Sequence, residues 1–195
     1  MPPQVYDVRG VQYSWGWLQE KYKCGMTAAP TGAAFRLVRI DEAEGPAVFI
    51  VNVRDQRGAP IRMQPVAQWW PGAEADEQAQ PLVGVGLQSV YHARAIVEHT
   101  NAGGDSGFPY GAGGVIHASV PYEFWVLSPF YASDALVGAG WLGGTNHVCP
   151  GRLTFQIVEP GAPPPEPEPT GDLAEALALL RQSNTYLAQI AGHYA

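Results

Sequence analysis

A chain of 195 residues with a formal net charge of −7 fits one globular domain with an appendage. The negative charge opposes the phosphate neutralisation that nucleic-acid binding requires, so DNA and RNA are not expected as partners. Only 15% of the residues are charged, and 23 glycines and 18 prolines predict many turns and few long helices. No stretch of about 18 apolar residues occurs, so no membrane span is expected, and the first ten residues show no signal peptide.

Residues 1–34 are expected to form an N-terminal segment that packs on the body through a short helix. Four apolar residues are spaced as on one face of a helix: Val11, Trp15, Leu18 and Tyr22. Gly25 is the expected helix stop.

Residues 35–159 are predicted to form an antiparallel β-sandwich, because short strand-like runs alternate with Gly, Pro, Asn and Asp. The runs cover 35–40, 47–55, 61–70, 81–88, 90–100, 114–120, 122–128 and 152–159. The run 47–55 is apolar on both faces, which predicts a central strand, and the turn signal at 57–60 predicts a hairpin with 61–70. Four residues are expected to share one core: Val51, Val53, Phe155 and Ile157.

The C-terminal region is predicted to hold a Pro-rich linker at 160–171 and an amphipathic helix at 172–195. The helix carries an apolar seam with heptad spacing, as in a coiled coil, formed by Leu173, Leu177, Leu180, Asn184, Leu187, Ala191 and Tyr194. The seam either folds back on the chain's own body or drives self-association or docking. The linker favours self-association or docking on a partner, because it holds the seam away from the body.

Aromatic residues are the most informative candidates for ligand binding. If Trp69 and Trp70 lie in a strand, their side chains point to opposite faces, so one of them is expected outside the core. A glycan-binding surface would combine ring platforms with hydrogen-bonding side chains, here Trp69, Trp70, Tyr110, Trp141, Asn146 and His147. The alternative is that both tryptophans are buried.

No catalytic residue, cofactor or metal site is expected. Ser106, in a Gly-Gly-Asp-Ser-Gly stretch with His92 and His99 upstream, resembles the nucleophile loop of trypsin-like serine proteases, but no separate base and acid loops accompany it. Ser106 is therefore expected in a turn without a catalytic role. The five histidines lack metal-site spacing, and Cys24 and Cys149 are read as two thiols or as one disulfide.

Two stretches resemble known modules. Residues 51–60, with Asp55, Gly58 and Pro60, resemble the D-x-x-G-x-P hairpin of carboxypeptidase-regulatory, transthyretin-like and Cna-B-like sandwiches, and Thr100, Gly107 and Phe108 resemble a stretched form of their later turn. Residues 122–155 resemble modules of bacterial and phage cell-wall-related proteins. The resemblance implies a transthyretin or Cna-B-like sandwich.

These observations predict a non-catalytic structural or interaction module, not an enzyme. It is expected to form a homo-oligomer or to join a larger protein assembly through its C-terminal helix, in a virion or at an extracellular surface. The absence of a visible signal peptide favours the virion. The first alternative is a module that binds cell-wall glycan, and the second is a serine hydrolase at Ser106.

Overall fold

The computed structural model of the chain describes residues 2–43, 48–82, 92–109, 121–140 and 149–159. The chain divides into two units, Met1–Pro163 and Pro164–Ala195, and every described residue belongs to the first. The predicted linker at 160–171 and the predicted helix at 172–195 therefore lie outside the described residues. So do the predicted strand at 114–120 and most of the run 81–88.

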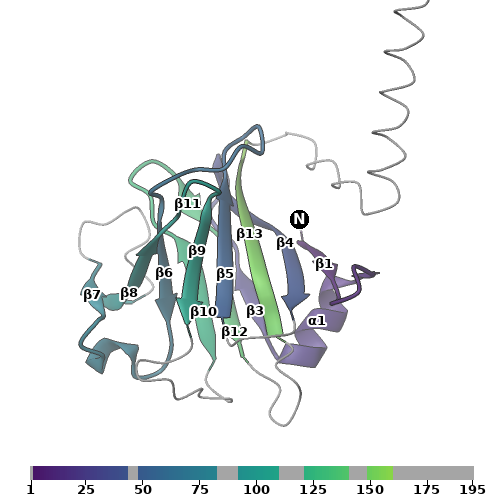
Figure 1. The fold of residues 1–195 in the computed structure, drawn as a ribbon, viewed down its shortest axis with the longest axis horizontal. Helices are drawn as coiled ribbons and strands as arrows, with labels where there is room; N and C mark the ends of the chain where they lie inside the picture. The colour runs from purple at the N-terminus through teal and green to yellow at the C-terminus, as the bar shows by residue number, and fades with distance from the viewer. Residues whose placement is uncertain (1, 44–47, 83–91, 110–120, 141–148, 160–195) are drawn as a thin grey trace, which may run out of the picture. The chain divides into compact units, whose positions relative to one another are not determined.

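The described part is mainly β and contains two sheets (Figure 1). The first sheet has the order β2-β1-β4-β13-β5-β9, with β11 also paired to β4. Its strands are β1 (Gln4–Tyr6), β2 (Gln12–Tyr13), β4 (Ala34–Ala43), β5 (Val48–Arg54), β9 (Asp105–Pro109), β11 (Ala132–Ser133) and β13 (Cys149–Val158).

The second sheet has the order β3-β12-β10-β6-β8-β7. Its strands are β3 (Gly25–Thr27), β6 (Pro65–Trp69), β7 (Gln80–Pro81), β8 (Arg94–His99), β10 (Tyr122–Val126) and β12 (Ala135–Ala139). A single turn of 3-10 helix, η1 (Ala73–Ala75), lies between β6 and β7.

The first sheet is mixed, so the prediction of a purely antiparallel arrangement is wrong. β13 runs antiparallel to β4 but parallel to β5, and β1 and β11 both run parallel to β4. The parallel pairs arise because chain segments distant in sequence meet side by side, with β13 inserted between β4 and β5 (Figure 1). The strand predicted at 47–55 is an inner strand, since β5 lies between β13 and β9.

The predicted hairpin between 47–55 and 61–70 is wrong, although its turn forms. The Asp55 carboxylate accepts hydrogen bonds from the backbone N–H groups of Arg57 and Ala59, both within 2.9 Å. Pairing is limited to one bridge between Arg54 and Pro60. Two hydrogen bonds of 2.9 Å flank it, from the Asp55 N–H to the Ala59 carbonyl and from the Ile61 N–H to the Val53 carbonyl. The chain crosses to the second sheet, where β6 pairs with β8 and β10.

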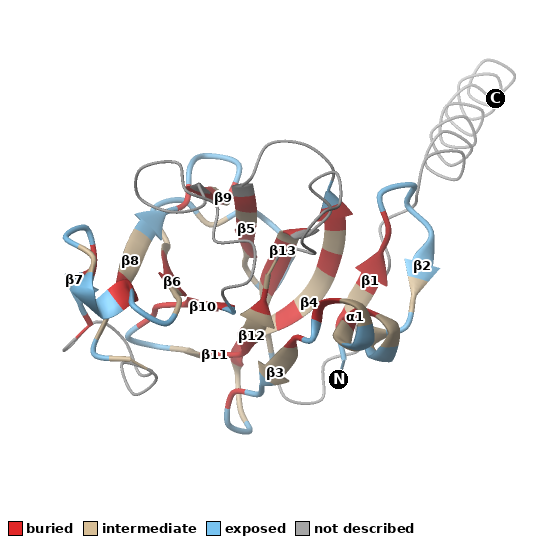
Figure 2. Cartoon of the chain, turned by 90° about the horizontal axis from the view of Figure 1, so that it is seen from below, coloured by how far each residue is buried: buried red, intermediate tan, exposed pale blue. Residues whose placement is uncertain are grey.

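A central apolar core lies between the facing sides of the two sheets. It includes all four predicted core residues, and the alternation along β5 and β13 places them on one face. Phe49 of the first sheet meets Phe124 of the second with ring centroids 4.6 Å apart. Figure 2 shows buried residues along the strands of both sheets. The prediction of one shared core is confirmed.

A second apolar cluster occupies the other face of the six-stranded sheet. Along β10, Tyr122, Phe124 and Val126 face the central core, whereas Trp125 alternates to the other face. The buried members of this cluster are Ala67, Leu82, Ala95, Trp125, Leu127 and Ala135. The second sheet is therefore buried on both sides at these positions.

The N-terminal helix α1 (Trp15–Tyr22) is shorter than the helix predicted from the apolar spacing, which began at Val11. Ser14 caps its start by accepting a hydrogen bond from the Trp17 N–H at 3.1 Å, and β2 occupies the preceding residues. Lys23, with φ 55°, ends the helix, so Gly25 is not the stop. Leu18 and Tyr22 are buried in the central core, as the spacing predicted.

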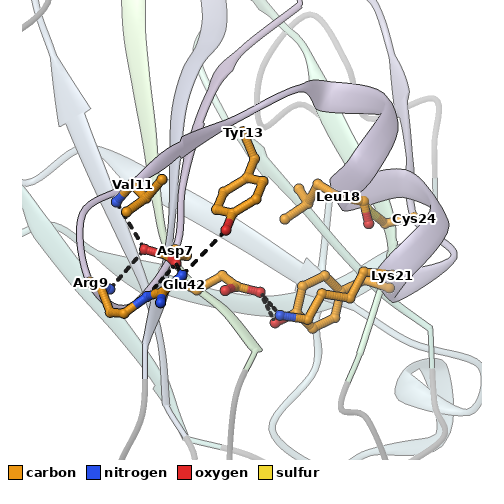
Figure 3. Close-up of polar contacts among 9 residues, drawn as sticks. Asp7, Arg9, Val11, Tyr13, Leu18, Lys21, Cys24 and Glu42 are labelled. Atoms are coloured by element: carbon orange, nitrogen blue, oxygen red, sulfur yellow. Dashed lines mark hydrogen bonds and ion pairs between the residues drawn. The ribbon is translucent and has the colours of Figure 1, made fainter.

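Polar contacts also anchor this segment to β4 (Figure 3). The buried carboxylate of Glu42 accepts hydrogen bonds from the Lys21 ammonium and the Tyr22 hydroxyl. Besides the helix, residues 1–34 contribute β1 and β2 to one sheet and β3 to the other.

Candidate functional site

Trp69 and Trp70 point to opposite faces of the second sheet, as predicted. Trp70 packs against the central core, with its ring centroid 6.0 Å from that of Tyr122, and burial raises the pKa of Tyr122. Trp69 packs against the second cluster on the other face. Of the predicted ligand-binding residues, these two are described.

Trp69 forms a compact polar and aromatic group with His92 and Glu123. Its ring is stacked on the His92 imidazole, with centroids 3.6 Å apart and an interplanar angle of 6°. His92 Nε2 lies 2.9 Å from a carboxylate oxygen of Glu123, and Glu123 is the register partner of Trp69 across β10 and β6. The imidazole and carboxylate are 16% and 20% exposed, so both retain access to solvent. A polar pair beside an indole is a chemistry suited to glycan contact.

The sequence interpretation missed Glu123, and it noted His92 only as a potential base for Ser106. No local motif marks the pair, because strand register brings these residues together. The other predicted ligand-binding residues lie outside the described residues: Tyr110, Trp141, Asn146 and His147. The same holds for the predicted seam residues Leu173, Leu177, Leu180, Asn184, Leu187, Ala191 and Tyr194.

Ser106 lies in β9, so its predicted place in a turn is wrong. Its side chain is on the core side of the strand, where Ser106 pairs with Val51. It is 2% exposed, and within the described part of the chain its hydroxyl makes no hydrogen bond. The hydrogen bond from serine to histidine that a hydrolase site uses is therefore not formed among the described residues.

The two loops that follow β5 and β10 expose large apolar side chains, and the first of them also exposes two arginines. Phe130 is 81% exposed and Met63 is 61% exposed, the highest values among large hydrophobic side chains of the described residues. Arg57 and Arg62 are exposed on the same loop as Met63. These four residues are called the Phe130 surface below.

Hydrogen bonds hold the loops of the Phe130 surface in place. The hydroxyl of buried Ser128 accepts hydrogen bonds from the backbone N–H groups of Phe130 and Tyr131, each at 3.2 Å. The two loops are joined because the Gln64 side chain donates to the Leu127 carbonyl, while the Leu127 N–H donates to the Pro65 carbonyl at 2.9 Å. Phe130 is therefore presented to solvent by a preorganised loop.

Cys24 is a free, buried thiol. It therefore agrees with the prediction of two thiols and not with the alternative of a disulfide. Its Sγ lies 4.0 Å from the Leu18 carbonyl oxygen (Figure 3). Burial raises the pKa of this thiol to about 11, so it stays protonated near neutral pH.

No family model, curated protein or solved structure matches this chain. Among the described residues, no group of three or more His, Cys, Asp or Glu side chains is placed to hold a metal ion. No helix within those residues is long and apolar enough to cross a membrane.

Proposed function

We propose that this chain is a non-catalytic, self-associating structural module of a virion or an extracellular surface. Its body would be a β-sandwich, an arrangement that the two sheets and their shared core support. The transthyretin or Cna-B-like kind is proposed only from the sequence resemblance that centres on residues 51–60. The observation that carries the proposal is the Phe130 surface. Phenylalanine, methionine and arginine are enriched at protein interfaces, whereas lysine and acidic residues are depleted there.

The energetic argument rests on Phe130 and Met63. Complete burial of such a side chain contributes roughly 1.5–3 kcal/mol, and both remain mostly in water in the single chain. The Ser128 turn fixes the Phe130 backbone before contact, which lowers the conformational entropy lost on association. The heptad seam predicted over 172–195 is the second proposed contact element.

Light scattering of the full chain over a range of concentrations tests the proposal. We expect Leu177→Asp with Leu180→Asp to lower the mass to one chain while the β signal in circular dichroism persists. For the double variant Met63→Ser with Phe130→Ser, we expect a mass that no longer rises with protein concentration. Val8→Ser with Val11→Ser is the matched control, because these residues are also exposed but lie elsewhere.

The outcomes separate the two contact elements. A single-chain mass for the unmodified protein at every concentration would refute self-association. If the Met63 and Phe130 variant behaves like the Val8 and Val11 control, the Phe130 surface is not a contact between copies. If the Leu177 and Leu180 variant keeps its assembly, the seam is not the main contact.

Binding of cell-wall glycan is the second candidate function, supported by the pair of polar groups beside Trp69. The test is co-sedimentation with insoluble cell-wall glycan, comparing the unmodified chain with Glu123→Gln. This substitution keeps the shape of the side chain but removes the charge next to His92. Equal sedimentation of both proteins would show that the Glu123 charge beside His92 does not contribute to glycan binding.

A further inference from the structure

Arg94 is a partly buried cation that forms no ion pair among the described residues. One terminal nitrogen, Nη2, donates to the Ala79 carbonyl at 2.5 Å. Its Nε is buried and makes no hydrogen bond within the described part of the chain. Buried guanidinium groups are normally paired with an anion, because removing a charge from water is costly.

Gln68 brings a second unsatisfied donor to the same strand pair. The residue is 3% exposed, and its Nε2 makes no hydrogen bond to any described residue. Gln68 pairs with Ile96 across β6 and β8, and Arg94 precedes Ile96 by two positions. Arg94 and Gln68 are therefore diagonal neighbours on one face of the second sheet.

That face is the one turned toward the central core, where it has an aromatic neighbour. Ile96 and Trp70 both pack against this core. Trp70 follows the last residue of β6 and Arg94 is the first residue of β8, so both lie at the same end of this antiparallel strand pair. Two donors and an indole thus lie at one corner of the sheet.

Among the described residues, no carboxylate forms an ion pair with Arg94, and the acidic residues of the neighbouring elements are exposed or bonded elsewhere. Glu77, the acidic residue nearest in sequence to Ala79, is exposed, and one oxygen of Asp76 accepts the Gln78 N–H at 2.8 Å. Glu123 lies on the opposite face, where it pairs with His92. The segments 83–91 and 110–120, which adjoin β8 and β9 in sequence, contain neither Asp nor Glu.

We propose that Arg94 and Gln68 form a subsite for the carboxylate group of a ligand. The Arg94 Nε–H and the Gln68 amide would each donate to one carboxylate oxygen, and the guanidinium would neutralise the single negative charge. A carboxylate suits the two donors because it has two oxygens and one charge. The group can come from an acidic sugar or from an acidic polypeptide residue. This site is independent of the Phe130 surface.

Nuclear magnetic resonance of the full chain tests the subsite directly, through the Arg94 Nε–H and Gln68 side-chain NH₂ signals. D-glucuronate is compared with neutral D-glucose, and N-acetyl-aspartate with N-acetyl-alaninamide, at constant ionic strength. We expect saturable shifts of both signals with at least one acid and with neither neutral probe. The acid that binds more tightly identifies the source of the carboxylate.

Two variants separate binding from folding. Arg94→Lys keeps the positive charge but removes Nε, and Gln68→Met replaces the amide with an apolar chain of similar length. Each should weaken binding of the acid by about tenfold or more. Arg9→Lys, at an arginine whose side chain is 71% exposed, should leave binding unchanged. Without ligand, Gln68→Met should be at least as stable as the unmodified chain, because it removes a buried donor that has no acceptor.

Three results would overturn the proposal. The first is the absence of a shift with both acids, and the second is an equal shift with chloride. The third is marked destabilisation by Gln68→Met without ligand, which would mean that the amide already has a structural partner.

Discussion

Removal of the Asp134 carboxylate should be among the most damaging single changes in the body. This side chain is 3% exposed and lies between β11 of the first sheet and β12 of the second. It accepts hydrogen bonds from the backbone N–H groups of Ala29 at 2.8 Å and Leu37 at 3.0 Å, and from the Arg36 guanidinium at 3.0 Å. One carboxylate therefore connects the chain preceding β4, β4 itself and the crossing between the sheets.

The magnitude follows from what Asp134→Ala leaves behind. Two buried N–H groups lose their acceptor, at about 1–3 kcal/mol each, and the partly buried Arg36 loses its counter-charge. Loss of one partner of a buried ion pair typically costs about 3–5 kcal/mol, which we expect for the free energy of unfolding here. That is a large fraction of the roughly 5–15 kcal/mol that stabilises a typical domain.

Urea unfolding followed by tryptophan fluorescence measures this loss. Asp41→Ala is the matched control, because Asp41 also pairs with an arginine, Arg39, but is 23% exposed. The control should cost at most about 1 kcal/mol. If Asp134→Ala costs no more than Asp41→Ala, the argument from burial is wrong.

Three further predictions concern individual residues. Cys24 should resist alkylation near neutral pH until the chain unfolds, as peptide mapping by mass spectrometry would show, because burial raises its thiol pKa to about 11. Burial alone would raise the pKa of Asp7, but hydrogen bonds from Val11 and Arg9 hold that pKa below its ordinary value. The ionised carboxylate therefore contributes fully to stability above about pH 4. This contribution is lost as the pH falls through the lowered pKa. Protection of the Val11 amide from hydrogen exchange, taken relative to the intrinsic exchange rate at each pH, should therefore fall in acid, and this step should be absent in Asp7→Asn. Gly104→Ala should lower the free energy of unfolding in urea by about 2 kcal/mol or more, because its φ is +79° and a Cβ would lie 2.7 Å from the Val53 carbonyl oxygen. Gly58→Ala is the control: its φ is +81° but the space around it is open, so the loss should be smaller.

The strands found from sequence alone are those whose own composition favours extended backbone. β5 and β13 are rich in β-branched and aromatic residues, and both were predicted close to their observed bounds. β9 and β12 were missed because each contains glycine, and β9 also contains serine and proline. Their extended conformation comes from pairing with β5 and with β10, a tertiary effect that a local pattern does not contain.

The candidate sites were harder to predict for a related reason. Alternation alone was sufficient to assign Trp69 and Trp70 to opposite faces. The contact between His92 and Glu123 and the placement of Arg94 beside Gln68 depend on which strands pair and in which register. The Phe130 surface depends on two loops joined by the Gln64 side chain, and no feature of either loop's sequence indicates the other.

The distribution of unsatisfied donors is the strongest reason to look for function on β6 and β8. The two buried carboxylates of Glu42 and Asp134 are satisfied: Glu42 accepts from Lys21 and Tyr22, and Asp134 accepts three hydrogen bonds. The Ser106 hydroxyl of β9 makes no hydrogen bond to any described residue. On β6 and β8, Gln68, Trp69 and Arg94 each retain a buried donor nitrogen that has no acceptor among the described residues. An unsatisfied buried donor lowers stability, so three of them on one strand pair are better explained by a ligand that supplies acceptors than by chance.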